Sequence, residues 1–317
     1  MIDGLLVGDI GGTNARFGMA RQSRTGEWTI EHFAKYAGDD YPTLQEAITN
    51  YIKAFNLTPK HISLAVAGPI ENGEATLTNR AWSVSETGLI TEFGVQNAGL
   101  FNDFAAMARS VPELKPTDFD VLKDGLAKPL EPILVAGAGT GFGVAYLLPD
   151  RGQWHTISSE GGHIAYVPRT PEELVVRDIL ARDHGYVSLE LVSSGSGLNK
   201  VHKAVCERHK VSFKKISPDA IRAKAKAGDT ICLEVCQLRA HAIMGALGDL
   251  TLAGGARGGI VLAGGVTERM VEFITAPDAL SVFKNRGPRT DYMQDIPVRL
   301  MSNPIAPLIG AAALYKI

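Results

Sequence analysis

Two segments of the chain share one pattern, a strand, a glycine- and threonine-containing turn and a second strand. This repetition constrains the fold more than any other feature. The first segment runs from Val7 to Ala20 and the second from Val135 to Leu147. Similarity between distant parts of one chain indicates a fold made of related halves. We therefore expect two halves that each open with a hairpin, with the two turns on opposite walls of one cleft.

Length and residue patterning give the expected domain organisation. The chain has 317 residues, and about 150 residues per domain suggests about two domains. Strand patterns mix with amphipathic helical patterns over the first hundred residues, which is typical of an α/β fold, and the helical share rises afterwards. We expect a small α/β domain formed by residues 1–102 plus 303–317, and a larger α/β domain formed by residues 103–302.

Periodicity predicts the individual elements. Apolar residues at helical spacing predict helices over residues 43–55, 171–184, 196–209, 217–227 and 230 to about 253. Short apolar runs predict strands over residues 133–137, 142–148 and 260–263. A last helix is expected over residues 306–317, after Asn303 and Pro304, and should return to cover the first domain.

Charge and cysteine content limit the classes of partner. Lys and Arg number 32 against 34 Asp and Glu, for a net charge of −2, which argues against nucleic acid or an anionic membrane as a partner. No apolar run approaches the roughly 18 residues of a membrane span, and no basic lead precedes the first strand, so a cytoplasmic protein is expected. Cys206, Cys232 and Cys236 lack the paired spacing of a zinc site and are predicted to be buried thiols.

The glycine turns are candidate phosphate sites. Glycine lets backbone amides approach an anion, and a threonine hydroxyl adds a donor. A P-loop string is absent from the sequence, and the dinucleotide fingerprint fails because Phe142 occupies the third glycine position and the turn leads into a strand. An ordinary tight hairpin also explains either turn alone. The presence of two such turns favours phosphate binding.

Asp9 and the pair Gly264–Gly265 extend this prediction. A carboxylate among glycines suits a Mg²⁺ ion held through water against phosphates, although a turn-capping aspartate is the alternative. The glycine pair follows a strand and precedes a helix expected near Thr267, so it forms either a wall for adenosine or a close strand-to-helix contact. The predicted nucleotide-binding residues are Gly8, Asp9, Ile10, Gly11, Gly12, Thr13, Asn14, Gly137, Gly139, Thr140, Gly141, Gly264 and Gly265.

Four motifs in this order resemble those of the bacterial glucokinases, namely residues 8–16, 101–104, 137–141 and 160–163. The resemblance spans nearly the whole chain. It implies the actin-like ATPase (ribonuclease H-like) fold, with two α/β domains and an interdomain cleft. It also implies ATP as the phosphoryl donor with Mg²⁺, glucose as the acceptor, and a homodimer. The zinc string of the related repressor and sugar kinase group is missing, so the chain is similar to the zinc-free branch.

The same resemblance implies a sugar site. Asn102 and Asp103 lie where a strand ends and a helix begins, and by themselves they would be read as helix caps. The resemblance assigns Asp103 as the base that accepts the proton of the sugar 6-hydroxyl group, and Asn102 as a partner of a neighbouring hydroxyl group. Transfer would then be in line, without a covalent enzyme intermediate.

Further sugar ligands are expected from other segments. The remaining predicted sugar-binding residues are Asn79, Glu160, His163 and Glu190. For Asn79 the alternative is a turn role, and for the Glu160–His163 segment the alternatives are a metal site or a surface turn. Near Glu190, Leu191 and Ser196 stand where the family pattern has Arg and Pro.

Three other functions share this pattern. One is a kinase for fructose, mannose or an N-acetylated amino sugar. Another is a non-catalytic sugar-responsive regulator, which would be expected to carry a basic helix-turn-helix extension. The third is a chaperone ATPase, which would be expected to carry a substrate-binding domain.

Overall fold

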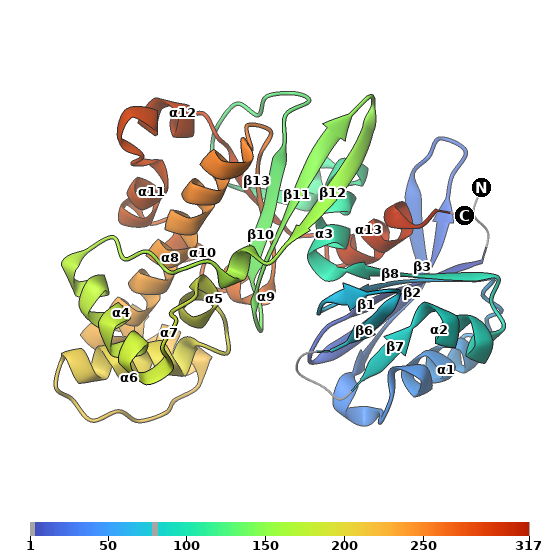
Figure 1. The fold of residues 1–317 in the computed structure, drawn as a ribbon, viewed down its shortest axis with the longest axis horizontal. Helices are drawn as coiled ribbons and strands as arrows, with labels where there is room; N and C mark the ends of the chain where they lie inside the picture. Colours follow the sequence, from blue (N-terminus) through green and yellow to red (C-terminus); the bar gives the residue numbers. More distant parts are fainter. Residues whose placement is uncertain (1–3, 78–81, 317) are drawn as a thin grey trace. The chain divides into compact units, whose positions relative to one another are not determined.

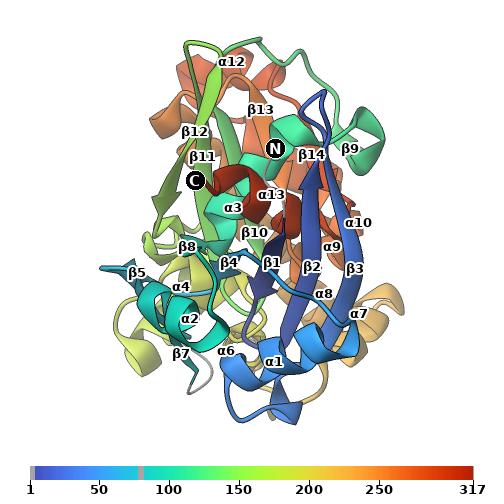
Figure 2. The ribbon, with the colours of Figure 1, turned by 90° about the vertical axis from the view of Figure 1, so that its right-hand side faces the viewer.

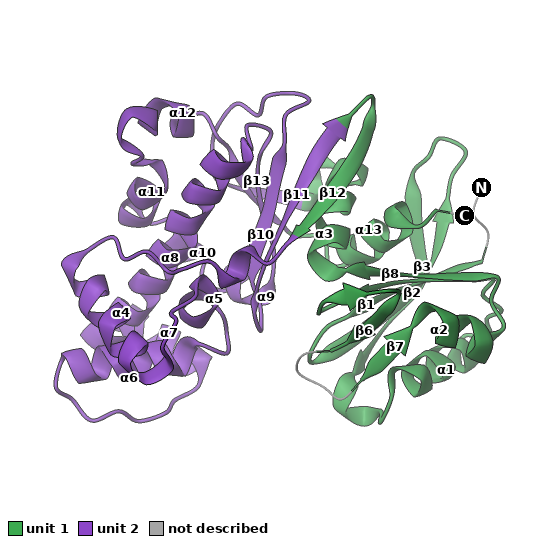
Figure 3. Cartoon of the chain, viewed as in Figure 1, with its two compact units in different colours: residues 1–118, 150–158, 302–317 green, residues 119–149, 159–301 purple. Residues whose placement is uncertain are grey.

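The computed structural model describes residues 4–77 and 82–316. The chain divides into two units, one formed by residues 1–118, 150–158 and 302–317 and the other by residues 119–149 and 159–301 (Figure 3). The expected boundary after Asn102 thus falls inside unit 1. The reason is that the helix beginning at Asp103 packs closely on the C-terminal helix.

Unit 1 is built on a sheet of order β3-β2-β1-β4-β8 (Figure 2). The strands are β1 (Leu5–Ile10), β2 (Asn14–Gln22), β3 (Trp28–Ala37), β4 (His61–Val66) and β8 (Asn97–Asn102). β1, β4 and β8 are parallel, and β1–β2 is the antiparallel hairpin that the first repeated segment predicts. A small second sheet contains β5 (Ile70–Glu71), β6 (Glu74–Thr76) and β7 (Ser83–Ser85).

Helices cover both faces of this sheet, which explains why every residue of β1 is buried. Leu6 and Ile10 pack with α1 (Leu44–Ala54) and α2 (Glu86–Phe93) on one face. Leu5 and Val7 pack with α3 (Asp103–Ser110) and α13 (Ala306–Leu314) on the other. The prediction that the C-terminal helix returns to cover the first domain is confirmed.

The second large sheet, most of whose residues lie in unit 2, has the order β12-β11-β10-β13-β14-β9, and its strands β10 to β13 are labelled in Figure 1. Its first five strands repeat the strand order of the unit 1 sheet. The strands are β9 (Phe119–Lys123), β10 (Ile133–Ala138), β11 (Phe142–Asp150), β12 (Gln153–Ser159), β13 (Gly259–Leu262) and β14 (Val298–Met301). β10 and β11 form the antiparallel hairpin that the second repeated segment predicts, and β10, β13 and β14 are parallel.

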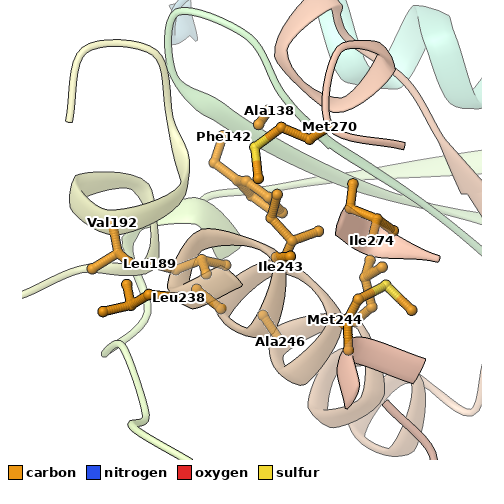
Figure 4. Close-up of a cluster of buried hydrophobic side chains, with 14 of the residues drawn as sticks. Ala138, Phe142, Leu189, Val192, Leu238, Ile243, Met244, Ala246, Met270 and Ile274 are labelled. Atoms are coloured by element: carbon orange, nitrogen blue, oxygen red, sulfur yellow. The ribbon is translucent and has the colours of Figure 1, made fainter. Parts of the chain in front are cut away.

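The helices of unit 2 surround the long helix α8 (Thr230–Gly254). Asp229 caps its first turn by accepting a hydrogen bond from Cys232 N, and Gly255 ends it in a left-handed conformation with φ 62°. The side chains of the core around α8 appear in Figure 4. The other helices are α4 (Pro171–His184), α5 (Leu189–Ser193), α6 (Leu198–Arg208), α7 (Pro218–Lys226), α9 (Gly265–Glu268), α10 (Val271–Ile274), α11 (Pro277–Lys284) and α12 (Thr290–Gln294).

The cysteines and the hydropathy of the helices also bear on the sequence predictions. All three cysteine thiols are free and buried, as predicted. Burial raises the pKa of Cys232 and that of Cys236 to about 11, so these two thiols are protonated at neutral pH.

Over the part of the chain that the structure describes, no helix is long and apolar enough to span a membrane.

Candidate functional site

The carboxyl edge of the unit 1 sheet carries the first group of predicted residues. The strand register aligns Ile10 with Val66 and Val66 with Asn102 across three parallel strands. Neighbouring strands lie about 4.8 Å apart, so Ile10 and Asn102 are separated by roughly 10 Å. The turn that follows Ile10 and the pair Asn102–Asp103 therefore share one edge, which is where parallel α/β sheets bind ligands.

The first glycine turn is compact. Gly11 N donates to Asn14 O at 3.0 Å, and Gly38 N donates to Thr13 O at 2.9 Å. A Cβ atom on Gly11 would meet only Asn14 O, at 3.5 Å, so this part of the turn is open to a ligand. A Cβ atom on Gly8 would instead lie 2.6 Å from the Leu64 side chain, and this glycine serves packing between β1 and β4.

Asp9 is a buried residue of β1 and is paired with its neighbour in the hairpin. Arg16 lies opposite Asp9 in the register, and Arg16 Nη1 donates to Asp9 Oδ2 at 2.5 Å. Burial raises the pKa of Asp9, and the Arg16 guanidinium opposes that effect. Arg16 is not among the predicted site residues, although it lies in the first motif. The feature of the sequence that could have identified it is the predicted hairpin, because antiparallel pairing places residues 9 and 16 opposite each other.

Asn102 and Asp103 form the junction between β8 and α3. Asn102 is the N-cap of α3, and its Oδ1 accepts from Ala105 N at 3.1 Å. Asp103 Oδ1 accepts from Phe104 N at 2.8 Å, which orients the carboxylate in the first turn of the helix. A carboxylate in this position is stabilised by the positive end of the helix dipole. Asn102 therefore has the capping role that the sequence alone predicts. The Asp103 carboxylate lies in the first turn of α3, at the edge of the sheet.

A second group of residues gathers at the corresponding edge of the unit 2 sheet. The parallel register of β10 and β13 places the Gly139–Gly141 turn beside Gly264 and Gly265. Cβ atoms on Gly137 and Gly264 would lie 1.8 Å from Ala263 O and 2.6 Å from Ala138 O, so these two glycines allow close backbone packing. Cβ atoms on Gly139 and Gly265 would meet nothing within 4 Å. Only the latter two leave open backbone for a ligand.

Glu190 lies against the second glycine turn. Its Oε2 accepts from Phe142 N at 2.8 Å, and a Cβ atom on Gly141 would lie 2.5 Å from the same oxygen. The carboxylate is thus held by the backbone of the turn, and no local pattern predicts this partner, which lies 48 positions away. Thr267, which is fully buried, holds the other side, because its Oγ1 accepts from Ala138 N at 2.8 Å.

Glu160 and His163 occupy a short 3-10 segment beside β11. Their side chains are 79% and 60% exposed and approach at 3.9 Å, between Glu160 Oε2 and His163 Nε2. A Cβ atom on Gly162 would lie 2.0 Å from Phe142 O, so the segment packs directly against the end of the glycine turn. An antiparallel bridge from Ala165 to Ser188 links the same segment to the start of α5, which carries Glu190.

The structure therefore brings the predicted residues together within two groups, one in each unit. Asn79 lies outside the described residues. Among residues 4–77 and 82–316, no group of three or more His, Cys, Asp or Glu side chains is arranged to hold a metal ion.

A family model for glucokinase matches residues 6–317. The chain is 37% identical to a glucokinase of Caulobacter sp. (strain K31), over 97% of this chain and 93% of the relative. It is 35% identical to a glucokinase of Saccharophagus degradans, over 97% of both chains. A crystal structure of glucokinase from an Antarctic psychrotroph superposes with a TM-score of 0.86, at 34% identity, over 99% of this chain and 98% of that one.

Proposed function

Because the chain belongs to the glucokinase family, which has the two-domain α/β fold of the actin-like ATPases, we propose that it transfers the γ-phosphoryl group of ATP to the 6-hydroxyl group of D-glucose. Family membership confirms the prediction of an ATP-dependent hexose kinase. The observation that carries the catalytic assignment is the shared sheet edge in unit 1, where Asp103 and the first glycine turn lie two strands apart.

In this proposal Asp103 is the general base. Its carboxylate accepts a hydrogen bond from Phe104 N in the first turn of α3, so it is held in one orientation when the sugar binds. It accepts the proton of the 6-hydroxyl group as that oxygen attacks the γ-phosphorus atom. Asn102, held as the helix cap, presents its amide to a neighbouring sugar hydroxyl group.

Unit 2 supplies the remaining predicted contacts. The open backbone at Gly139 and Gly265 would receive the nucleotide, while Glu160, His163 and Glu190 would bind sugar hydroxyl groups. Bound Mg²⁺ would neutralise phosphate charge, and Asp9 of β1, which Arg16 holds in place, would reach the ion through water. The two compact units are proposed to be the two domains of the enzyme, and the protein is proposed to act in the cytoplasm at the entry to glycolysis.

A homodimer is part of the same proposal. Unit 2 carries exposed apolar side chains within one stretch of the chain, at Ile164, Val167, Leu174, Val175 and Tyr186. Exposed apolar side chains are candidate contacts for such a dimer, because contiguous apolar patches mark protein–protein interaction sites. Light scattering of the purified chain should give twice the monomer mass, and a monomeric mass at micromolar concentration would contradict the dimer.

The decisive experiment measures glucose 6-phosphate formation from glucose and Mg-ATP by the purified protein. Asp103→Asn should lower kcat by roughly 10²- to 10⁴-fold with little change in the KM for glucose. The N-cap bond from Ala105 N goes to Asn102, so α3 is kept and the melting temperature should change little. Near-normal turnover by this variant would rule out Asp103 as the base. Turnover on fructose, mannose or an N-acetylated amino sugar that exceeds turnover on glucose would favour another hexose kinase.

A further inference from the structure

Arg239 is an unusual residue for the middle of a buried helix. It lies in α8 and is only 4% exposed. No carboxylate in the described ranges forms an ion pair with it, although buried arginine is normally paired with an acid. Burial lowers the pKa of Arg239 to about 10, so the side chain still carries its positive charge at neutral pH.

The guanidinium instead donates to three backbone carbonyl groups. Nε donates to Val192 O at 3.3 Å, and Nη2 donates to Ser193 O at 2.8 Å and to Ser194 O at 2.9 Å. These carbonyl groups belong to the end of α5 and the residue after it, where helix carbonyls lack partners within the helix. Figure 4 shows Leu189 and Val192 of α5 beside Leu238 of α8, so apolar contacts and the Arg239 bonds hold the same segment.

That segment in turn holds the second glycine turn. Gly195 N donates to Gly139 O at 2.9 Å, and Ser196 N donates to Thr140 O at 3.3 Å. A Cβ atom on Gly195 would lie 3.0 Å from Gly139 O, so the two backbones are in close contact. Arg239 is therefore connected to the turn through one short segment, residues 192–196.

We propose that Arg239 is a positioning residue for the nucleotide, which fixes residues 192–196 against the Gly139–Gly141 turn so that the turn presents its backbone to the phosphates in one conformation. The inference rests on the proposed function for the role of that turn.

The test compares Arg239→Met and Arg239→Lys with Arg286→Met. Arg286 serves as the control because it also donates to backbone carbonyl groups, with Nη2 to Gly245 O of α8 and Nη1 to Val282 O of α11 at 2.6 Å each, and it differs from Arg239 in pairing with Asp249. For each variant the melting temperature, kcat and the two KM values are measured.

Arg239→Met should raise the KM for ATP by about 10-fold or more, while the KM for glucose changes by less than about 3-fold. Arg239→Lys, which keeps the charge and can still donate to a carbonyl group, should recover part of the ATP affinity. Arg286→Met should lower the melting temperature without changing the KM for ATP. An unchanged KM for ATP in Arg239→Met, or an equal rise in Arg286→Met, would overturn the proposal.

A second variant and a binding measurement test the proposal if Arg239→Met does not fold or if the protein lacks kinase activity. If Arg239→Met does not fold, Arg239→Lys serves alone, and a KM for ATP equal to that of the wild type together with an unchanged melting temperature would overturn the proposal. Binding of the non-hydrolysable analogue AMPPNP is also measured by calorimetry. A wild-type protein that binds AMPPNP but phosphorylates no glucose would refute the proposed function, and the ratio of AMPPNP affinities would still test Arg239.

Discussion

Gly137 and Gly139 lie two residues apart, yet the structure assigns them opposite roles. A Cβ atom on Gly137 would lie 1.8 Å from Ala263 O, with Ala263 C at 2.7 Å and Ala263 N at 3.0 Å. All three are backbone atoms of the neighbouring segment, so no side-chain rotation can relieve the contact. The same atom on Gly139 would meet nothing within 4 Å, and Gly139 does not have a left-handed φ.

The cost of Gly137→Ala can be worked from these contacts. The Cβ atom is roughly 1.6 Å short of an ordinary contact with Ala263 O, so β10 and the end of β13 must separate by a comparable distance. Overpacking of this kind costs about 1–3 kcal/mol. Separation also breaks the bond from Ala263 N to Ala136 O (3.0 Å) and strains the bond from Ala138 N to Thr267 (2.8 Å), at about 1 kcal/mol each.

Gly137→Ala should therefore lower the free energy of unfolding by about 3–5 kcal/mol, which corresponds to a fall in melting temperature of roughly 6–20 °C for a domain of this size. Differential scanning calorimetry measures this change. Gly139→Ala is the matched control and should stay within about 0.5 kcal/mol of the wild type, while its KM for ATP rises several-fold. A melting temperature for Gly137→Ala within about 2 °C of the wild type would refute the reasoning from backbone contact.

Two further predictions concern other parts of the molecule. Ser63 is fully buried and its Oγ donates to Ala311 O of α13 at 2.7 Å, so Ser63→Ala should destabilise unit 1 by about 1–3 kcal/mol in urea unfolding; an unchanged midpoint would show that water replaces this bond. His241 lies between Glu173 (2.7 Å) and Asp278 (3.0 Å), and the hydrogen bond to Glu173 is the largest of the effects that raise its pKa. The stability that protonated His241 contributes is complete below the ordinary histidine pKa of about 6.5 and is lost as the pH rises through the raised value. The unfolding free energy should fall over that range in the wild type and fall less in His241→Gln; equal slopes would contradict the assignment.

Local sequence patterns predicted the elements that depend on nearby residues. The helices α1, α4, α6, α7, α8 and α13 all begin and end within two or three residues of their expected limits. Their caps are visible in the sequence, as with Thr43, whose side chain accepts from Glu46 N, and Thr170, whose side chain accepts from Glu173 N. Both glycine hairpins were also predicted, because the turn residues and the flanking strands are contiguous.

Elements that depend on distant partners were not predicted. β3 is partly exposed along its length. β9 and β14 are short strands that pair with each other although they are far apart in the sequence. None of these three strands has an apolar run long enough to predict it. The helix after Gly264 begins at Gly265, before the expected Thr267, because Gly264 has a φ of 94° that lets the chain turn directly into the helix.

The sequence by itself determined the two hairpins, the family and the candidate residues, because each of these is written in contiguous motifs. Tertiary structure alone decided what each residue touches. It separated the glycines that allow backbone packing from those that stay open, paired Asp9 with Arg16, and placed Glu190 on the amide of Phe142. It also gave Arg239 its three carbonyl partners, which lie more than forty positions away. The physical reason is that steric contact, burial and hydrogen bonding act between atoms that are close in space, and one sequence read along the chain does not specify those distances.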